Sequence, residues 1–132
     1  MRVLKPITAF CCHNALYKGL QEDVEKAYVE GVDIVETPCS GKVDPIYILK
    51  AFEKGADCVV VMACEEDVCM TIEGSKRARK RVERTRRLME EAGLEPDRLV
   101  LFIVKRPALD DLENLMEKAR KIAAKLGPSP VR

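Results

Sequence analysis

An apolar run in the middle of the chain constrains the fold more than any other feature of the sequence. Residues 58–63 read Cys-Val-Val-Val-Met-Ala, and Cys64 extends the run. A strand with this sequence is apolar on both faces, as the buried strands of parallel sheets are. The run is too short for a membrane-spanning helix, which needs about 20 apolar residues. We therefore predict a buried strand in a parallel sheet that is covered by helices on both faces.

Predicted strands and helices alternate along the whole chain. The strands are expected at residues 2–10, 32–37, 58–63 and 99–104, and the helices at 14–30, 45–54, 73–92 and 107–126. Asp44 and Pro45 are suited to open a helix, and Gly31, Gly55 and Gly93 are suited to end one. This alternation predicts an α/β fold: a single-domain three-layer sandwich with a four-stranded parallel sheet, flavodoxin-like or Rossmann-like. The domain is expected to span residues 1–126, followed by a frayed tail at 127–132.

The composition limits the classes of protein that remain. A length of 132 residues suits one domain, and 34% charged with 47% apolar residues excludes a disordered chain. The net charge of +1 gives no general attraction to nucleic acid or to membranes. Lys5 and Pro6 interrupt any signal-like apolar stretch, so we expect a soluble, cytoplasmic protein. The glycine-rich phosphate-binding motifs of dinucleotide-binding and P-loop proteins are missing from the sequence.

Five of the six cysteines follow predicted strands. Cys11 and Cys12 come after the first strand, Cys39 after the second, and Cys64 and Cys69 after the third. The carboxyl ends of parallel strands share one edge of the sheet, and open α/β sheets bind ligands there. In a reducing cytosol, clustered cysteines more often bind metal or carry out redox chemistry than form disulfides. We therefore predict a metal or redox site at this edge, and we expect Cys58, at the opposite end of its strand, to be a buried packing residue.

Several kinds of site remain open on the residues alone. Four thiolates suit either zinc or an iron–sulfur cluster. Zinc sites usually contain two tight cysteine pairs, and here only Cys64 and Cys69 approach that spacing. His13 could replace one ligand, but a lone histidine is more often a surface or helix-start residue, and at best we expect it to neighbour the ligands. Asn and Gln number three in total, a hyperthermophile trait, and hyperthermophile cytosols tolerate disulfides. A metal-free thiol–disulfide protein and a zinc-stabilised interaction module are therefore the alternatives.

Several segments together resemble a known family. They are Cys39-Ser-Gly-Lys-Val-Asp with its continuation to Asp57, Ala63-Cys-Glu-Glu-Asp-Val-Cys69, Ile72-Glu-Gly74, Lys80-Arg-Val82 and Gly93-Leu-Glu-Pro-Asp-Arg-Leu99. The chain resembles, over about residues 10–99, the delta subunit of the methyl-viologen-reducing hydrogenase, an iron–sulfur subunit of methanogens, acetogens and sulfate reducers. The resemblance implies one [2Fe–2S] cluster and a non-catalytic role in electron transfer. Electrons would pass from a hydrogenase, or another dehydrogenase, to the flavin-containing subunit of a heterodisulfide reductase.

The resemblance also implies a set of cluster ligands. Cys39, Cys64 and Cys69 match cysteines of the family. Many members have Cys-x-x-Cys in the first loop, where this chain reads Cys12-His-Asn-Ala15, and others have a pair such as Cys11-Cys12. Adjacent residues of an extended chain point to opposite sides, so Cys11 and Cys12 are not both expected to bind. A [2Fe–2S] cluster needs four ligands, and Cys12, Cys39, Cys64 and Cys69 supply them, with Cys11 as the alternative in the first loop.

Residues beside these cysteines are expected to tune the cluster. Ser40 and Gly41 follow Cys39 and could donate backbone N–H groups to cluster sulfur. Glu65, Glu66 and Asp67 lie between Cys64 and Cys69. Their negative charge disfavours the reduced cluster and is expected to lower its potential.

The predicted helix at 73–92 is strongly basic. Eight cations fall within twelve residues: Lys76, Arg77, Arg79, Lys80, Arg81, Arg84, Arg86 and Arg87. A charge run of this kind is often a solvated helix face. We favour docking to an acidic surface of a partner protein, because complementary charges steer association. The low net charge argues against nucleic acid as the partner, and no membrane partner is expected.

Overall fold

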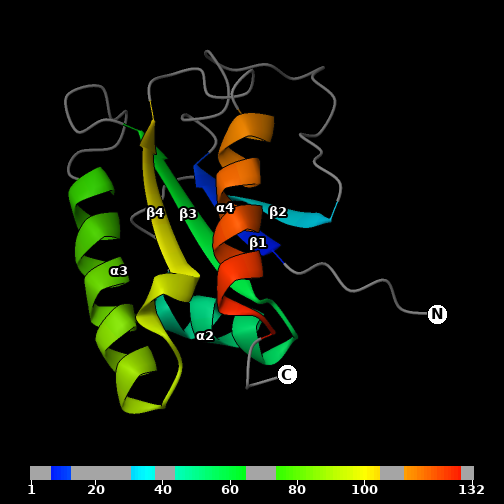
Figure 1. The fold of residues 1–132 in the computed structure, drawn as a ribbon. Helices are drawn as coiled ribbons and strands as arrows, with labels where there is room; N and C mark the ends of the chain where they lie inside the picture. Colours follow the sequence, from blue (N-terminus) through cyan, green and yellow to red (C-terminus); the bar gives the residue numbers. More distant parts are fainter. Residues whose placement is uncertain (1–6, 13–30, 38–43, 65–73, 105–111, 129–132) are drawn as a thin grey trace.

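The computed structural model describes residues 7–12, 31–37, 44–64, 74–104 and 112–128 (Figure 1). Its strands are β1 (Ile7–Cys12), β2 (Val32–Thr37), β3 (Cys58–Cys64) and β4 (Leu99–Val104). Its helices are α2 (Pro45–Glu53), α3 (Gly74–Glu91) and α4 (Leu112–Leu126), with a short 3₁₀ helix η3 (Pro96–Arg98) before β4. The helix predicted at residues 14–30 lies outside the described residues.

The four strands form one parallel sheet in the order β2-β1-β3-β4. This confirms the predicted α/β fold, and the order is that of the first four strands of flavodoxin-like proteins. Val59, Val60 and Val61 of β3 are at most 1% exposed, as the apolar run predicts for an inner strand. The chain winds outward from β1 to β2 and then crosses back to β3. The direction of winding therefore reverses between β1 and β3, at the switch point where such sheets bind ligands.

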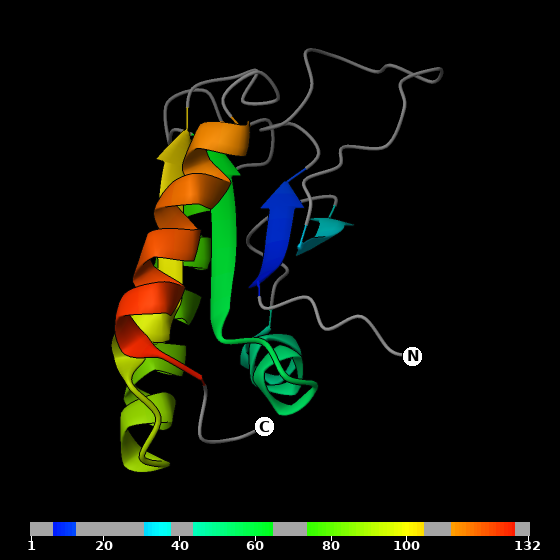
Figure 2. The same ribbon diagram turned by 45° about the vertical axis from the view of Figure 1, so that its right-hand side comes forward.

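Helices cover both faces of the sheet, which gives the expected three layers (Figures 1 and 2). On one face, alternate strand residues pack against α4 through Leu112, Met116 and Ala119. On the other face, the intervening residues pack against α2 and α3. Each strand thus contributes alternate side chains to two cores, as the two-residue period of a strand requires.

Most predicted boundaries agree with the structure, and the first strand differs in a way that concerns the site. The strands at 32–37 and 99–104 have the predicted bounds, and α2 and α3 agree with prediction to within one residue at each end. The first strand was expected to end at Phe10, but β1 continues through Cys12. Both cysteines that were expected in the first loop are therefore the last residues of β1.

Two of the predicted end signals act as expected. The side chain of Asp44 accepts a hydrogen bond from the backbone N–H of Ile46 at 3.4 Å, so Asp44 caps α2 ahead of Pro45. Gly93 has a φ of 82°, a left-handed conformation that favours glycine, and it turns the chain from α3 toward β4.

Arg98 joins the chain segments at the amino-end edge of the sheet. Its guanidinium donates to the carbonyls of Asp57, just before β3, and of Leu126, at the end of α4. It also donates to Gly127 and Pro128, the first two residues of the predicted frayed tail. Fraying stays a prediction for residues 129–132, which lie outside the described part of the chain. No described helix is long and apolar enough to cross a membrane.

Candidate metal centre

Cys12 and Cys64 end two neighbouring parallel strands at the same edge of the sheet. β1 pairs with β3 through Cys11 and Met62, so Cys12 lies one register step further on and Cys64 two steps. Strand spacing and rise place the Cα atoms of Cys12 and Cys64 about 6 Å apart. In Figure 2 the arrowheads of β1 and β3 end side by side. The structure thus places the ends of both strands at the β1–β3 switch point.

The remaining residues predicted for the site lie outside the described part of the chain. They are Cys39, Ser40, Gly41 and Cys69, together with His13 and the acidic residues 65–67. The strand that leads to Cys39 is described, and its last residue, Thr37, pairs with Cys12. Among the described residues, no three histidine, cysteine or acidic side chains lie together in an arrangement that could hold a metal ion.

Cys11 occupies a different environment from the edge of the sheet. Its side chain is 0% exposed and belongs to the apolar core between the sheet and α4. Ile7 and Ala9, which precede it at two-residue spacing on β1, lie in the same core. The Cys11 thiol lies 3.9 Å from the carbonyl oxygen of Ala9, a weak sulfur hydrogen bond. Cys11 is therefore packed as a small apolar side chain.

Cys58 lies at the opposite edge, as expected. It begins β3, pairs with Ile7 at the start of β1, and is 0% exposed. The pKa of its thiol is raised to about 12, chiefly by burial; the charge of Arg98 opposes the shift, and that of Asp57 adds to it. Cys58 is therefore a protonated packing residue, far from the ends of β1 and β3.

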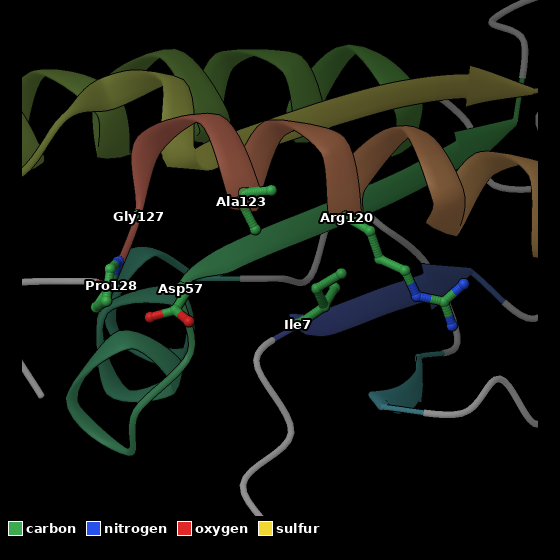
Figure 3. A pocket seen from close by; sticks show the side chains of 7 residues that line it. Ile7, Asp57, Arg120, Ala123, Gly127 and Pro128 are labelled. Atoms are coloured by element: carbon green, nitrogen blue, oxygen red, sulfur yellow. The ribbon is translucent and has the colours of Figure 1, made fainter.

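A shallow hollow lies at this same amino-end edge (Figure 3). It has a volume of about 410 Å³ and lies between the last turns of α4 and the starts of β1 and β3. Ile7, Asp57, Arg120 and Ala123 are among the residues that line it. Because Ile7 opens β1 and Asp57 precedes β3, the hollow is at the far end of the strands from Cys12 and Cys64. It does not belong to the candidate centre.

The basic helix carries two kinds of cation. Arg86 donates two hydrogen bonds, of 2.7 and 3.1 Å, to the carbonyl of Leu99 and so ties α3 to the start of β4. Arg81 lies 3.9 Å from the carboxylate of Asp44, the cap of α2. These structural roles were not anticipated, because nothing in the spacing of the basic residues distinguishes them from their exposed neighbours. By contrast, Arg77, Lys80, Arg84 and Arg87 are exposed.

The fold and the shared edge define a class of protein: a flavodoxin-like α/β domain with cysteines at its switch point. The model of one family, "Methyl-viologen-reducing hydrogenase, delta subunit", matches residues 7–127. The chain belongs to this family, which confirms the resemblance seen in the sequence.

Two kinds of relative match the chain. The vhu iron-sulfur D component of the F420-non-reducing hydrogenase of Methanocaldococcus jannaschii is 34% identical over 96% of both chains. The protein of the same name from Methanopyrus kandleri is 31% identical over 92% of this chain and 94% of the relative. The A component of the ferredoxin/F420H2-dependent CoB-CoM heterodisulfide reductase of Methanosarcina acetivorans is 30% identical over 92% of this chain, which corresponds to 16% of the larger protein. The same kind of domain therefore occurs both as most of a hydrogenase component and as a small part of a reductase component.

Proposed function

We propose that this chain is an electron-transfer protein that holds an iron–sulfur cluster at the carboxyl edge of β1 and β3. The observation that carries the proposal is the placement of Cys12 and Cys64 on adjacent strands, about 6 Å apart at Cα by strand geometry. The ends of these two strands bring both cysteines to one edge of the sheet, and the stretches of chain that carry the other predicted ligands begin at the same edge. The names of the hydrogenase relatives, which are iron-sulfur subunits, support the same chemistry.

We further propose a [2Fe–2S] cluster with Cys12, Cys39, Cys64 and Cys69 as its ligands. Two residues of chain span at most about 7 Å, so covalent reach allows Cys39 to approach from Thr37, the partner of Cys12. Cys69 follows Cys64 by five residues and is within reach of the same place. Ser40 and Gly41 would donate backbone N–H groups to cluster sulfur. The cluster would accept and release one electron at a time, and the four thiolates would hold its irons.

The position of Cys11 favours Cys12 as the ligand from β1. A ligand must present its sulfur to the cluster, and the side chain of Cys11 is buried in the core beneath α4. Withdrawing it would open a cavity there, which costs free energy. Cys12 is the last residue of β1, at the edge where the centre is proposed, and we assign the ligand to it.

We also propose the direction of electron flow and the partners. Electrons would enter from a hydrogenase or another dehydrogenase and leave to the flavin-containing subunit of a heterodisulfide reductase. The relatives support both ends of this path, since some are hydrogenase components and others are heterodisulfide reductase A components that contain a similar region. The chain would act in the cytoplasm, without turnover of its own.

Metal and sulfide analysis of protein purified without oxygen tests this function. We expect iron and acid-labile sulfide in equal amounts, about two of each per chain, with sulfur-to-iron charge-transfer absorption. Reduction should add one electron and give a paramagnetic signal that Cys12→Ala abolishes. Zinc without sulfide would favour the interaction module, and a colourless protein that cycles between thiols and a disulfide would favour the metal-free alternative. Either result would overturn the proposal.

A further inference from the structure

We propose that the outer side of α3, together with the exposed start of α2, is a docking surface for an acidic patch on a partner protein. This inference deepens the proposed function, because it names the surface and the partner chemistry through which electrons would be exchanged. It does not require that the cluster be of a particular type.

Four cations form a stripe along α3, on the side away from the sheet. The buried residues of the helix are Ala78, Val82, Thr85 and Met89, which recur at helical spacing and face the core. Arg77, Lys80, Arg84 and Arg87, hereafter the basic stripe, recur at intervals of three, four and three residues and are exposed. At 3.6 residues per turn, the basic stripe lies nearly opposite the buried residues. Four positive charges therefore project from one side of the helix.

The basic stripe is distinct from the cations that hold the fold together. Arg86 is committed to the carbonyl of Leu99, and Arg81 lies beside Asp44. Within the described part of the chain, no acidic side chain forms an ion pair with a member of the basic stripe. Like charges at three- or four-residue spacing repel one another on a helix. Glu83 lies three residues after Lys80 and four before Arg87 and offsets part of this repulsion, and an acidic partner surface would offset the rest.

Exposed apolar side chains accompany the stripe. Leu88 follows Arg84 by one helical turn and is 39% exposed. The contact between Arg81 and Asp44 brings the start of α2 to the middle of α3. Ile46 and Tyr47 follow Asp44 directly, and they are 54% and 55% exposed. A surface that combines arginines with an exposed aromatic and aliphatic residues has the composition of protein interfaces.

The same helix argues against a nucleic-acid partner. Glu83, Glu90 and Glu91 are also exposed on α3, and they would repel a phosphate backbone that continued along the helix. A phosphate backbone carries its charge as an extended, regular line. A compact acidic patch on a protein needs to match only the four cations of the stripe, whereas a phosphate backbone would also pass Glu90 and Glu91 at the end of the helix.

The stripe begins beside the candidate centre. α3 starts at Gly74, ten residues after Cys64, and Figure 1 shows its first turn near the arrowheads of β3 and β4. Arg77 is therefore the member of the stripe nearest the cysteine edge, and Arg87 is the farthest. A partner that docks on the stripe would be held next to that edge. Electron transfer requires such proximity, because its rate falls steeply with distance.

Two matched charge reversals test the docking surface. The first variant is Lys80→Glu, Arg84→Glu and Arg87→Glu on the stripe. The control is Lys118→Glu, Lys121→Glu and Lys125→Glu, three exposed lysines of α4 on the other face of the sheet. Both variants change the net charge by the same amount, so general electrostatic effects are equal. The probe is the purified heterodisulfide reductase A component from the same organism, and the readouts are its affinity for each variant and the absorption spectrum of the cluster.

We expect the stripe variant to bind about tenfold or more weakly at low salt, and the control to stay within about threefold of the unmodified protein. Salt should weaken binding of the unmodified protein and should affect the stripe variant less. Leu88→Ala should raise the dissociation rate, whereas the charge reversal should mainly lower the association rate. Equal binding by the two triple variants, or tighter binding of duplex DNA than of the protein probe, would overturn the docking proposal.

The two proposals fail in different ways. A protein that contains no iron but still shows the difference between the stripe variant and the control would retain the docking surface and lose the proposed electron-transfer function. A protein with an intact cluster spectrum and no such difference would retain the function and lose the docking surface.

Discussion

The guanidinium of Arg98 donates a 2.7 Å hydrogen bond to the carbonyl of Gly127, which lies 29 residues further along the chain. The side chain of Arg98 is 1% exposed, and a carboxylate oxygen of Glu95 lies 2.8 Å from it. Leu126 and Gly127 end α4, where backbone carbonyls lack helical donors and carry partial negative charge. One buried arginine therefore closes the end of α4 against the amino-end edge of the sheet. This gives a structural role to Arg98 within the segment 93–99, one of the segments that resemble the family.

Replacement of Arg98 should destabilise the fold strongly. Arg98→Met removes the donors of four carbonyl groups, so we expect the free energy of unfolding to fall by about 3 kcal/mol. Arg120→Met is the control, because Arg120 pairs with Glu113 and Glu117 at the surface and should lose at most about 1 kcal/mol. Urea unfolding of both variants gives the comparison. Similar losses for the two would mean that the Arg98 network contributes little.

Arg86 and Arg87 are sequence neighbours with opposite expected roles. Arg86→Met should reduce the free energy of unfolding by about 1–3 kcal/mol, because it leaves the carbonyl of Leu99 without its two donors. Arg87→Met should change stability by less than about 0.5 kcal/mol, because Arg87 is exposed. Thermal unfolding measures both. A larger loss for Arg87→Met than for Arg86→Met would contradict the division of the basic helix into structural and docking residues.

Stability should fall at alkaline pH because of Cys58. Its pKa is raised from 9.0 to about 12 by burial, so the unfolded chain loses this proton before the folded protein does. The protonated Cys58 thiol therefore contributes to the free energy of unfolding, and this contribution is fully present below about pH 9. It is lost as the pH rises toward 12, by roughly 1.4 kcal/mol per pH unit. Urea unfolding at pH 8, 9.5 and 10.5 follows the decline. Cys58→Ala should be less stable at pH 8 but show a shallower decline, and equal slopes would exclude this cause.

Cys11 and Cys12 should differ in their effect on the cluster. Cys12→Ala removes a proposed ligand, so the variant should lose iron and sulfide. Cys11→Ala removes a buried sulfur from the core and should cost about 1 kcal/mol of stability while keeping the cluster. Iron content and unfolding are measured on both proteins after purification without oxygen. Iron loss in Cys11→Ala with retention in Cys12→Ala would reverse the assignment.

The acidic residues between Cys64 and Cys69 in the sequence should lower the cluster potential. Glu65→Gln, Glu66→Gln and Asp67→Asn together remove negative charge that disfavours the reduced cluster, so the midpoint potential should rise. Glu90→Gln, Glu91→Gln and Asp97→Asn are the matched control, with the same three changes on exposed residues at the far end of α3 and beyond. A redox titration followed by absorption measures the potential. A rise of equal size in the control would show that net charge, and not the position of the acids, is responsible.

The layered fold could be predicted from the sequence alone. The apolar run predicts the buried strand β3. Asp44 with Pro45 predicts the start of α2, and Gly93 predicts the turn after α3. Each of these signals depends on residues that are close together in the sequence. The position of Cys12 and Cys64 at one edge of the sheet could be predicted as well, because parallel strands share their carboxyl edge. Cys39, Cys69, Ser40 and Gly41 stay predictions, since they lie outside the described residues.

The packing of the chain distinguishes residues that look alike in the sequence. The cysteines of β1 are adjacent, yet the structure buries the side chain of Cys11 under α4 and ends the strand at Cys12. Arg86 and Arg87 are equally basic, yet Arg86 alone of the two reaches the carbonyl of Leu99. Arg98 is far in sequence from its partners, which are the carbonyls of residues 57 and 126–128. Such roles depend on groups that are distant in sequence, and only the folded chain brings those groups together.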